Sequence, residues 1–260
     1  MKKPVLVALC SVALIGIILI WSLSLPKGTV SVKGARAERV PNEPDALHLV
    51  LQIENGDQPD LLLGATSDAA QNIALISTTG QSSVPIPSNS TPVLSTDGAY
   101  IRLTGIEEEL DEGRMIPVTL EFQHGKSLST RAPVSAPTDP HAAHRAMIAN
   151  ADNSAERDHP APSLDMSVAE RVDGQWQVEL ELANFQFEPD SSDPVDRPGY
   201  GHAHLYVNGL KLQRMYSETA TIGQLPPGSY QVRVSLNTNT HMPYVDDAGP
   251  VAAEATIKVE

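Results

Sequence analysis

The residue types best suited to binding a metal ion gather in one short segment, GHAHLYVNGLKLQRMY, at positions 201–216. Asn208-Gly209 is the pair preferred at the centre of a two-residue type I′ turn, so the segment is predicted to form a β-hairpin. With that turn His202 pairs with Met215, and His202 and His204 project from one face because side chains alternate along a strand. The opposite, core-facing side then holds Ala203, Leu205, Val207, Leu210 and Leu212.

Two imidazoles and a thioether on one face make a donor set for a transition metal. Imidazole with thioether suits copper better than Mg²⁺ or Ca²⁺, which prefer oxygen ligands. A third imidazole is expected from His241, which follows the strand pattern YQVRVSLN and has Met242 beside it. We therefore predict a copper site formed by His202, His204, Met215 and His241, in which the thioether favours Cu(I) and the imidazoles also accept Cu(II).

Other interpretations of these residues stay open. An H-x-H pair also occurs on the polar face of an ordinary half-exposed strand, and the protein would then be a metal-free interaction or assembly module that docks to a membrane partner. His141, His144 and His159 lie with Met147 in a stretch that is either a polar linker or a segment able to capture copper.

Catalysis and nucleic-acid binding find little support in the sequence. No nucleophile elbow, zinc-protease helix, P-loop or dinucleotide-binding pattern is present, so we do not expect an enzyme. An iron or zinc centre could use the two strand histidines and an acid such as Asp246, although nothing in the sequence brings that acid near them. The formal net charge of −14 argues against nucleic acid as a partner, because phosphate binding needs clusters of Lys and Arg.

The N-terminus predicts the compartment. Residues 4–25 carry no charge and follow Lys2 and Lys3, which indicates a transmembrane helix with a cytoplasmic N-terminus. The competing interpretation is a signal peptide cleaved after residues 35–37, which lie far beyond the apolar run. Lipidation at Cys10, the chain's single cysteine, is disfavoured because the apolar run continues well past it. We expect a single-pass inner-membrane protein whose domains lie in the periplasm.

The rest of the chain is predicted to be all-β, since 21 prolines, 17 glycines and short alternating runs favour strands and turns over long helices. We expect two β-sandwich domains, the first cupredoxin-like and the second an Ig-like antiparallel sandwich, after one N-terminal transmembrane helix. The predicted boundaries are 1–26 for the anchor, 27–126 for the first domain, 127–163 for a Pro- and Ala-rich linker and 164–260 for the second domain.

The first domain has a recognisable pattern. Within residues 46–123 stand LHLVLQIENGDQPDLLLGATSDAA, IPSNSTPVLSTDGAYIRLTGI and LDEGRMIPVTLEF, in which Ile116, Val118, Leu120 and Phe122 share one face. This region resembles the PCuAC family of periplasmic copper chaperones, which implies a cupredoxin-like sandwich that binds Cu(I) with two His and two Met.

Those family ligands are not present here. The resemblance places them near Ile76, near Pro87 and on Tyr100-Ile101-Arg102, where the cation of Arg102 replaces a thioether. We therefore expect the first domain to keep the fold without binding copper at the family site. The whole sequence predicts a membrane-tethered copper-binding protein that serves as a copper chaperone or buffer, with a membrane-bound cuproenzyme or copper-trafficking protein as the acceptor.

Overall fold

The computed structural model describes residues 30–124, 127–136, 160–192 and 194–260, and every regular element among them is a β-strand. The all-β prediction is confirmed for these residues. They contain no helix with the length and apolarity needed to cross a membrane. The predicted anchor at 1–26 lies outside them.

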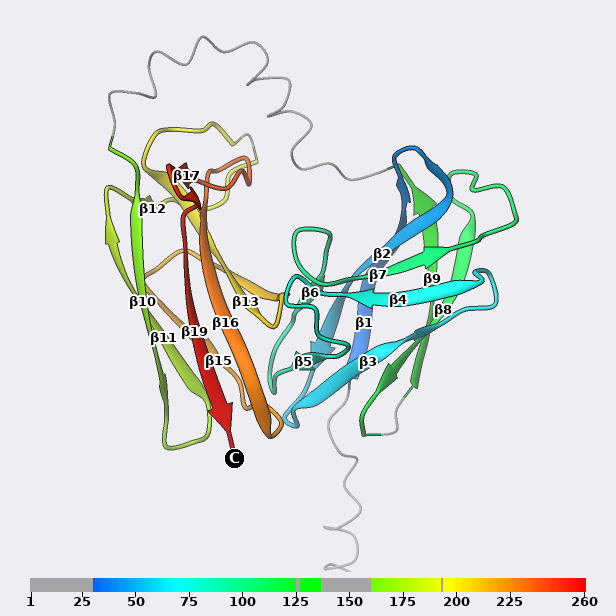
Figure 1. The fold of residues 1–260 in the computed structure, drawn as a ribbon, viewed down its shortest axis with the longest axis horizontal. Coiled ribbons are helices and arrows are strands. Elements are labelled where there is room, and N and C mark those ends of the chain that lie inside the picture. Colours follow the sequence, from blue (N-terminus) through cyan, green and yellow to red (C-terminus); the bar gives the residue numbers. More distant parts are fainter. Residues whose placement is uncertain (1–29, 125–126, 137–159, 193) are drawn as a thin grey trace, which may run out of the picture.

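The first half of the molecule, blue to green in Figure 1, comprises nine strands. They are β1 (Val30–Val40), β2 (Glu43–Asn55), β3 (Asp60–Thr66), β4 (Asn72–Ile76), β5 (Val84–Ile86), β6 (Val93–Leu94), β7 (Tyr100–Thr104), β8 (Met115–Phe122) and β9 (Ser127–Ser135). The alternating pattern of β8 buries Ile116, Val118, Leu120 and Phe122, as the sequence predicts.

The second half, yellow-green to red, comprises ten strands. They are β10 (Ser163–Glu170), β11 (Trp176–Ala183), β12 (Gln186–Phe187), β13 (Tyr200–Val207), β14 (Leu210–Met215), β15 (Thr219–Ile222), β16 (Gly228–Asn237), β17 (Val245–Asp246), β18 (Gly249–Pro250) and β19 (Ala252–Val259). β13 lies between β14 and β16, so its outer face can carry a site flanked on both sides by paired strands.

The predicted linker at 127–163 begins with a strand. Val30–Val40 pairs with β2, and Ser127–Ser135 pairs with β8 and β1. The composition of β9, rich in Ser, Ala and Pro, suggests a linker, but its alternate residues Ala132 and Val134 are buried. The first half therefore extends beyond the predicted boundary at residue 126.

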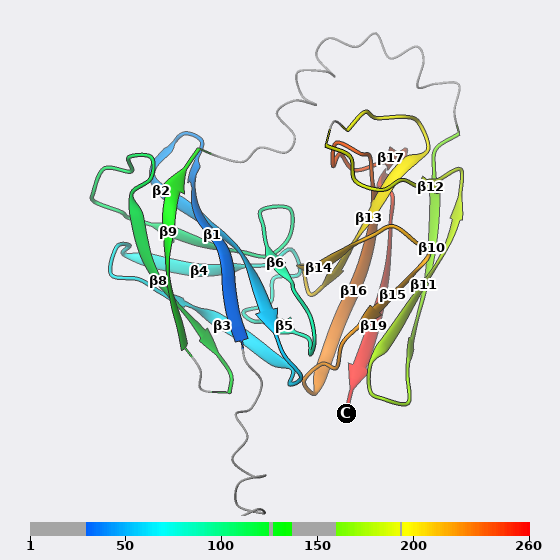
Figure 2. The same cartoon turned by 180° about the vertical axis from the view of Figure 1, so that it is seen from behind.

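The two halves pack against each other, with β6 between them in both views (Figures 1 and 2). A 14-stranded sheet runs through both halves because β14 pairs with β6 at Lys211 and Val93. The Ser77 hydroxyl also donates to the Asn208 carbonyl at 2.6 Å. These contacts place the β13–β14 hairpin beside the first half.

Glycines allow this close approach. A Cβ on Gly223 would lie 1.8 Å from the Ser88 carbonyl oxygen, and one on Gly98 would lie 2.4 Å from the carbonyl oxygen of Gly209. Both pairs join one half to the other, and neither gap admits a larger residue without backbone movement. The backbone amide of Ser88 completes the contact by donating to the Gln224 carbonyl at 2.9 Å.

Candidate metal centre

The β13–β14 hairpin forms as predicted at its turn and differs at its open end. Asn208 and Gly209 have φ values of 47° and 80°, as a type I′ turn requires. The predicted core-facing residues are all buried: Ala203, Leu205, Val207, Leu210 and Leu212.

A register shift between Leu205 and Tyr206 changes the pairing beyond the turn. Met215 lies opposite Ala203, and Arg214 rather than Gln213 lies opposite His204. The predicted pairing of His202 with Met215 is therefore wrong. Met215 is buried in the hydrophobic core, away from the face that carries the histidines.

Three of the four predicted ligands do converge. His202 and His204 extend from β13, and His241 reaches them from the turn that follows β16. The His202 Nε2 to His204 Nε2 distance is 3.0 Å, and the His241 Nδ1 to His202 Nε2 distance is 2.9 Å. Three imidazole nitrogens bound tetrahedrally to one ion at ~2.05 Å would lie ~3.3 Å apart, so small side-chain adjustments suffice to hold a metal.

The hydrogen bonds around the three histidines determine how many protons their facing nitrogens can carry. The hydroxyl of Tyr206 donates to Asp97 Oδ2 at 3.3 Å, so its oxygen accepts from His204 Nδ1 at 3.1 Å. His204 then presents a lone pair at Nε2. His202 Nε2 lies near both His204 Nε2 and His241 Nδ1, and a single proton can be shared in only one of these two contacts. The three facing nitrogens therefore carry one proton and two lone pairs. A cation would satisfy all three at once.

Burial keeps these imidazoles neutral, which is the form that binds metal. His202 and His204 are only 1% and 2% exposed. Desolvation, with the neighbouring His241 and Arg214, lowers the pKa of His202 to about 4. Desolvation and Lys211 lower the pKa of His204 further, and desolvation and Arg214 lower that of His241.

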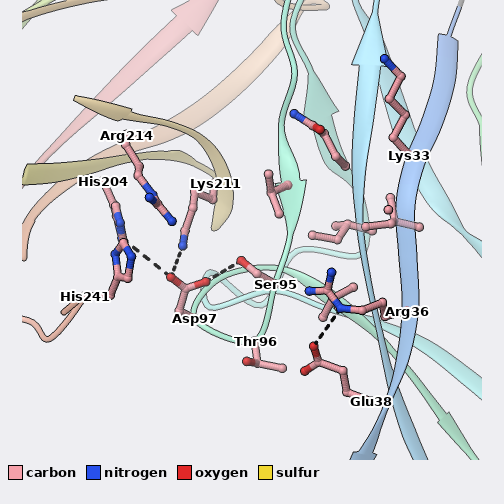
Figure 3. A pocket seen from close by; sticks show the side chains of 16 residues that line it. Lys33, Arg36, Glu38, Ser95, Thr96, Asp97, His204, Lys211, Arg214 and His241 are labelled. Atoms are coloured by element: carbon pink, nitrogen blue, oxygen red, sulfur yellow. Dashed lines mark hydrogen bonds and ion pairs between the residues drawn. The ribbon is translucent and has the colours of Figure 1, made fainter. Parts of the chain in front are cut away.

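Asp97 is the contribution of the first half to this centre. It lies in the segment after β6 and forms an ion pair with Lys211, as Figure 3 shows. Burial raises the pKa of its carboxyl, but the charge of Lys211 and hydrogen bonds from Lys211 and Ser95 outweigh burial and hold that pKa below its ordinary value. The ionised carboxylate accepts from Tyr206 and so orients His204, as second-shell groups do in metal sites.

A braced turn presents the third imidazole. His241 has a φ of 70°, in the left-handed region that L-residues seldom adopt. Its amide donates to the Thr238 carbonyl at 3.0 Å, and its own carbonyl accepts from Asn237 Nδ2 at 3.3 Å. Asp196 accepts hydrogen bonds from both the amide and the hydroxyl of Thr240. These contacts hold the strained residue in place.

Other proposed ligands lie elsewhere. Asp246 accepts from the amides of Ala248 and Gly249 in its own turn and does not belong to the histidine cluster. His141, His144 and His159 lie outside the described residues. Among the described residues, the three-histidine group is the one cluster of its kind.

The family ligand positions of the first half hold a different network. Arg102 bonds to Glu43 and approaches His48 Nε2 at 3.3 Å. The ring of His48 lies against Tyr100, with centroids 4.5 Å apart. Ile76 lies opposite Tyr100 across the β4–β7 pair. An arginine occupies the centre of this group, so no metal-binding cluster forms there among the described residues.

The family match concerns the first half. Residues 30–134, less than half of the chain, match a family model described as "Putative lipoprotein LpqE-like". No curated protein matches the chain at a significant level.

Solved structures that resemble the chain include PCuAC domains. The apo PCuAC domain from PmoF1 is 20% identical, with a TM-score of 0.38 over 42% of this chain and 94% of that one. The copper-bound PCuAC domain from PmoF2 is 19% identical, with a TM-score of 0.38 over 42% and 93%. The Cu(I) form of DR1885 from Deinococcus radiodurans is 27% identical, with a TM-score of 0.37 over 44% and 82%. The predicted resemblance of the first half is confirmed, and the family match ends before the second half begins.

Proposed function

We propose that the protein is a membrane-tethered, extracytoplasmic copper-binding protein that buffers copper or delivers it to a membrane-bound acceptor. The observation that carries this proposal is the convergence of His202, His204 and His241, whose ligand atoms all lie within 4.8 Å of one another. His202 and His204 are buried and His241 is half-buried, and the lowered pKa values favour the neutral imidazoles that bind metal.

The three imidazole ligands support copper binding, but they favour Cu(II) rather than the Cu(I) that a methionine ligand would favour. Without Met215 the ligands are three imidazoles, so the thioether preference for Cu(I) no longer applies. Imidazole sites bind Cu²⁺ more tightly than Zn²⁺, Ni²⁺ or Co²⁺ by the Irving–Williams order. The PCuAC-like first half supports the same metal, since solved PCuAC domains are described as copper-bound.

Tethering is supported by the sequence before residue 30. The uncharged run at 4–25 is long enough for a helix to span a bilayer. The description of the matched family names a lipoprotein, for which Cys10 would be the acylated residue. Either anchor confines the site to a layer beside the membrane and raises its effective concentration toward a membrane-bound acceptor. The mass of the N-terminal peptide from purified membranes distinguishes a lipidated cysteine from an uncleaved helix.

Metal titration of the full chain in detergent micelles tests the binding site. We expect one Cu²⁺ per chain, and X-ray absorption spectra should show nitrogen ligands without a sulfur scatterer. His204→Gln should lower Cu²⁺ affinity at least about 100-fold, because it removes one of three ligands. His124→Gln, a surface control in the first half, should leave affinity unchanged.

Met215→Leu separates this site from the one that the sequence predicts. A core methionine exchanged for leucine should leave copper affinity unchanged, whereas a methionine ligand would be lost. Equal copper binding by the wild type and His204→Gln would refute the site. Absence of copper binding by the wild type would favour a metal-free interaction module.

A further inference from the structure

A cavity of about 390 Å³ opens beside the candidate metal centre, between the two halves. His204 and His241 form part of one wall together with Lys211 and Arg214. The opposite part is formed by β1 of the first half, which contributes residues such as Arg36 (Figure 3). Two of the three histidines therefore face a partly open cavity between the halves.

The charges of this cavity are unlike those of the whole chain. The protein has 32 acidic and 18 basic residues, yet the cavity is lined by four cations and two carboxylates. The cations are Lys33, Arg36, Lys211 and Arg214, and the carboxylates are Glu38 and Asp97.

Each of these cations has a carboxylate partner, but cations outnumber carboxylates on the lining itself. Lys33 and Arg214 pair with Glu54 and Asp190, neither of which lines the cavity. Lys211 pairs with Asp97, and Arg36 forms a longer ion pair with Glu38 at 3.7 Å. Cationic side chains therefore stand on both walls.

A bound metal ion would increase the excess of positive over negative charge around the cavity. Three neutral imidazoles add no negative charge to a divalent ion, and three-histidine sites leave a fourth position for an exogenous ligand. Lys211 and Arg214 line the cavity together with His204. Because Asp97 is already paired with Lys211, a divalent ion at this position would lack an anionic ligand of its own in a partly dehydrated space.

We propose that this cavity binds a small organic dicarboxylate, with one carboxylate on the open position of the metal and the other facing Arg36 and Lys33. The inference rests on the proposed metal site and adds a ligand class to it. Two cationic walls separated by a cavity favour two anionic groups over one, and guanidinium matches carboxylate geometry. Copper would then be held as a ternary complex, and its release would follow dissociation of the anion.

Titration of the Cu²⁺-loaded full chain with malonate, succinate and glutarate tests the proposal. The readouts are the electron paramagnetic resonance spectrum and the visible band of the bound Cu²⁺. At least one dicarboxylate should bind about tenfold more tightly than acetate, because charge-assisted bonds at the second wall add to the first contact. Succinamide, which is neutral, should leave the spectra unchanged.

Variants of the second wall supply the decisive comparison. Lys33 and Arg36 have largely exposed side chains, so Lys33→Gln with Arg36→Gln should leave folding and Cu²⁺ affinity intact. Dicarboxylate affinity should fall to the level of acetate, and Arg36→Lys alone should retain most of it. Lys258→Gln, exposed on β19, is the matched control and should have no effect.

The outcomes distinguish this inference from the proposed function. Cu²⁺ binding without any preference for dicarboxylates over acetate would overturn the inference and leave the metal site standing. Unchanged dicarboxylate affinity in the double variant would also overturn it, because the second wall would then play no part. Loss of Cu²⁺ binding in the wild type would remove both.

Discussion

The metal-free protein should lose stability as the pH falls from 7 to 5, because His202, His204 and His241 all have lowered pKa values, and the share of His202 can be worked out. Its pKa is about 4 in the folded protein and 6.5 in an ordinary environment. At pH 5 the unfolded chain therefore binds a proton at this position that the folded chain excludes. Stability is complete above pH 6.5 and declines toward pH 4, since the unfolded state binds more protons.

The magnitude follows from the two pKa values. Between pH 7 and pH 5 the linkage relation gives a loss of about 2 kcal/mol from His202 alone. Carboxylates contribute little in this window: Asp97 and Asp190 have pKa values below their ordinary 3.8. His48 shifts in the same direction, mainly through burial, and it is present in every variant compared.

Urea unfolding of the full chain with EDTA, at pH 7, 6 and 5, measures this effect. His202→Gln cannot be protonated, so its stability should fall about 2 kcal/mol less than that of the wild type over the same range. Lys258→Gln, exposed on β19, serves as the surface control and should follow the wild type. Parallel pH dependences for the wild type and His202→Gln would refute the assignment of a buried, neutral His202.

Three further outcomes are expected. Cu²⁺ affinity should change no more than about 30-fold between pH 7 and pH 5, whereas a site of three ordinary imidazoles would lose roughly 10⁴-fold in affinity to proton competition. Isothermal titration with Cu²⁺ at pH 7 and at pH 5 measures the difference. Asp97→Asn should lower Cu²⁺ affinity about 10- to 100-fold, and Asp57→Asn, an exposed control, should not lower it. Equal Cu²⁺ affinities of Asp97→Asn and the wild type would show that Asp97 plays no part in the centre. Gly223→Ala should cost at least about 2 kcal/mol of stability in urea, because its Cβ meets the Ser88 carbonyl at 1.8 Å; a wild-type midpoint would show that the halves do not pack as described.

The part of the site that the sequence predicts is the part with local periodicity. The two-residue spacing of His202 and His204 puts both on one face of any strand, and the Asn208-Gly209 turn fixes where the hairpin begins. The sequence also predicts that His241 can join them, because it follows a strand, but it does not predict the left-handed backbone conformation of this residue. The same alternation along the strand also places Tyr206 on the face of His202 and His204.

The part that the sequence misses depends on events that no local pattern records. One extra residue in β14 moves Met215 to the core and brings Arg214 opposite His204. A regular register is the only one that a sequence pattern can assume, and a bulge reverses the faces beyond it. Asp97 is more than one hundred residues from His204 and approaches it only because the two halves pack together.

The role of the first half follows from that packing. Its family ligand positions are filled by Ile76 and an Arg102 network, so copper binding there has no donor set. The same half supplies Asp97, which orients His204 through Tyr206, and the wall of the cavity that faces the histidines. The first half therefore supplies the carboxylate that orders the proton network and the cations on the facing wall, and none of the three candidate ligands. Its contribution to the candidate site is therefore to shape a centre whose ligands all come from the second half.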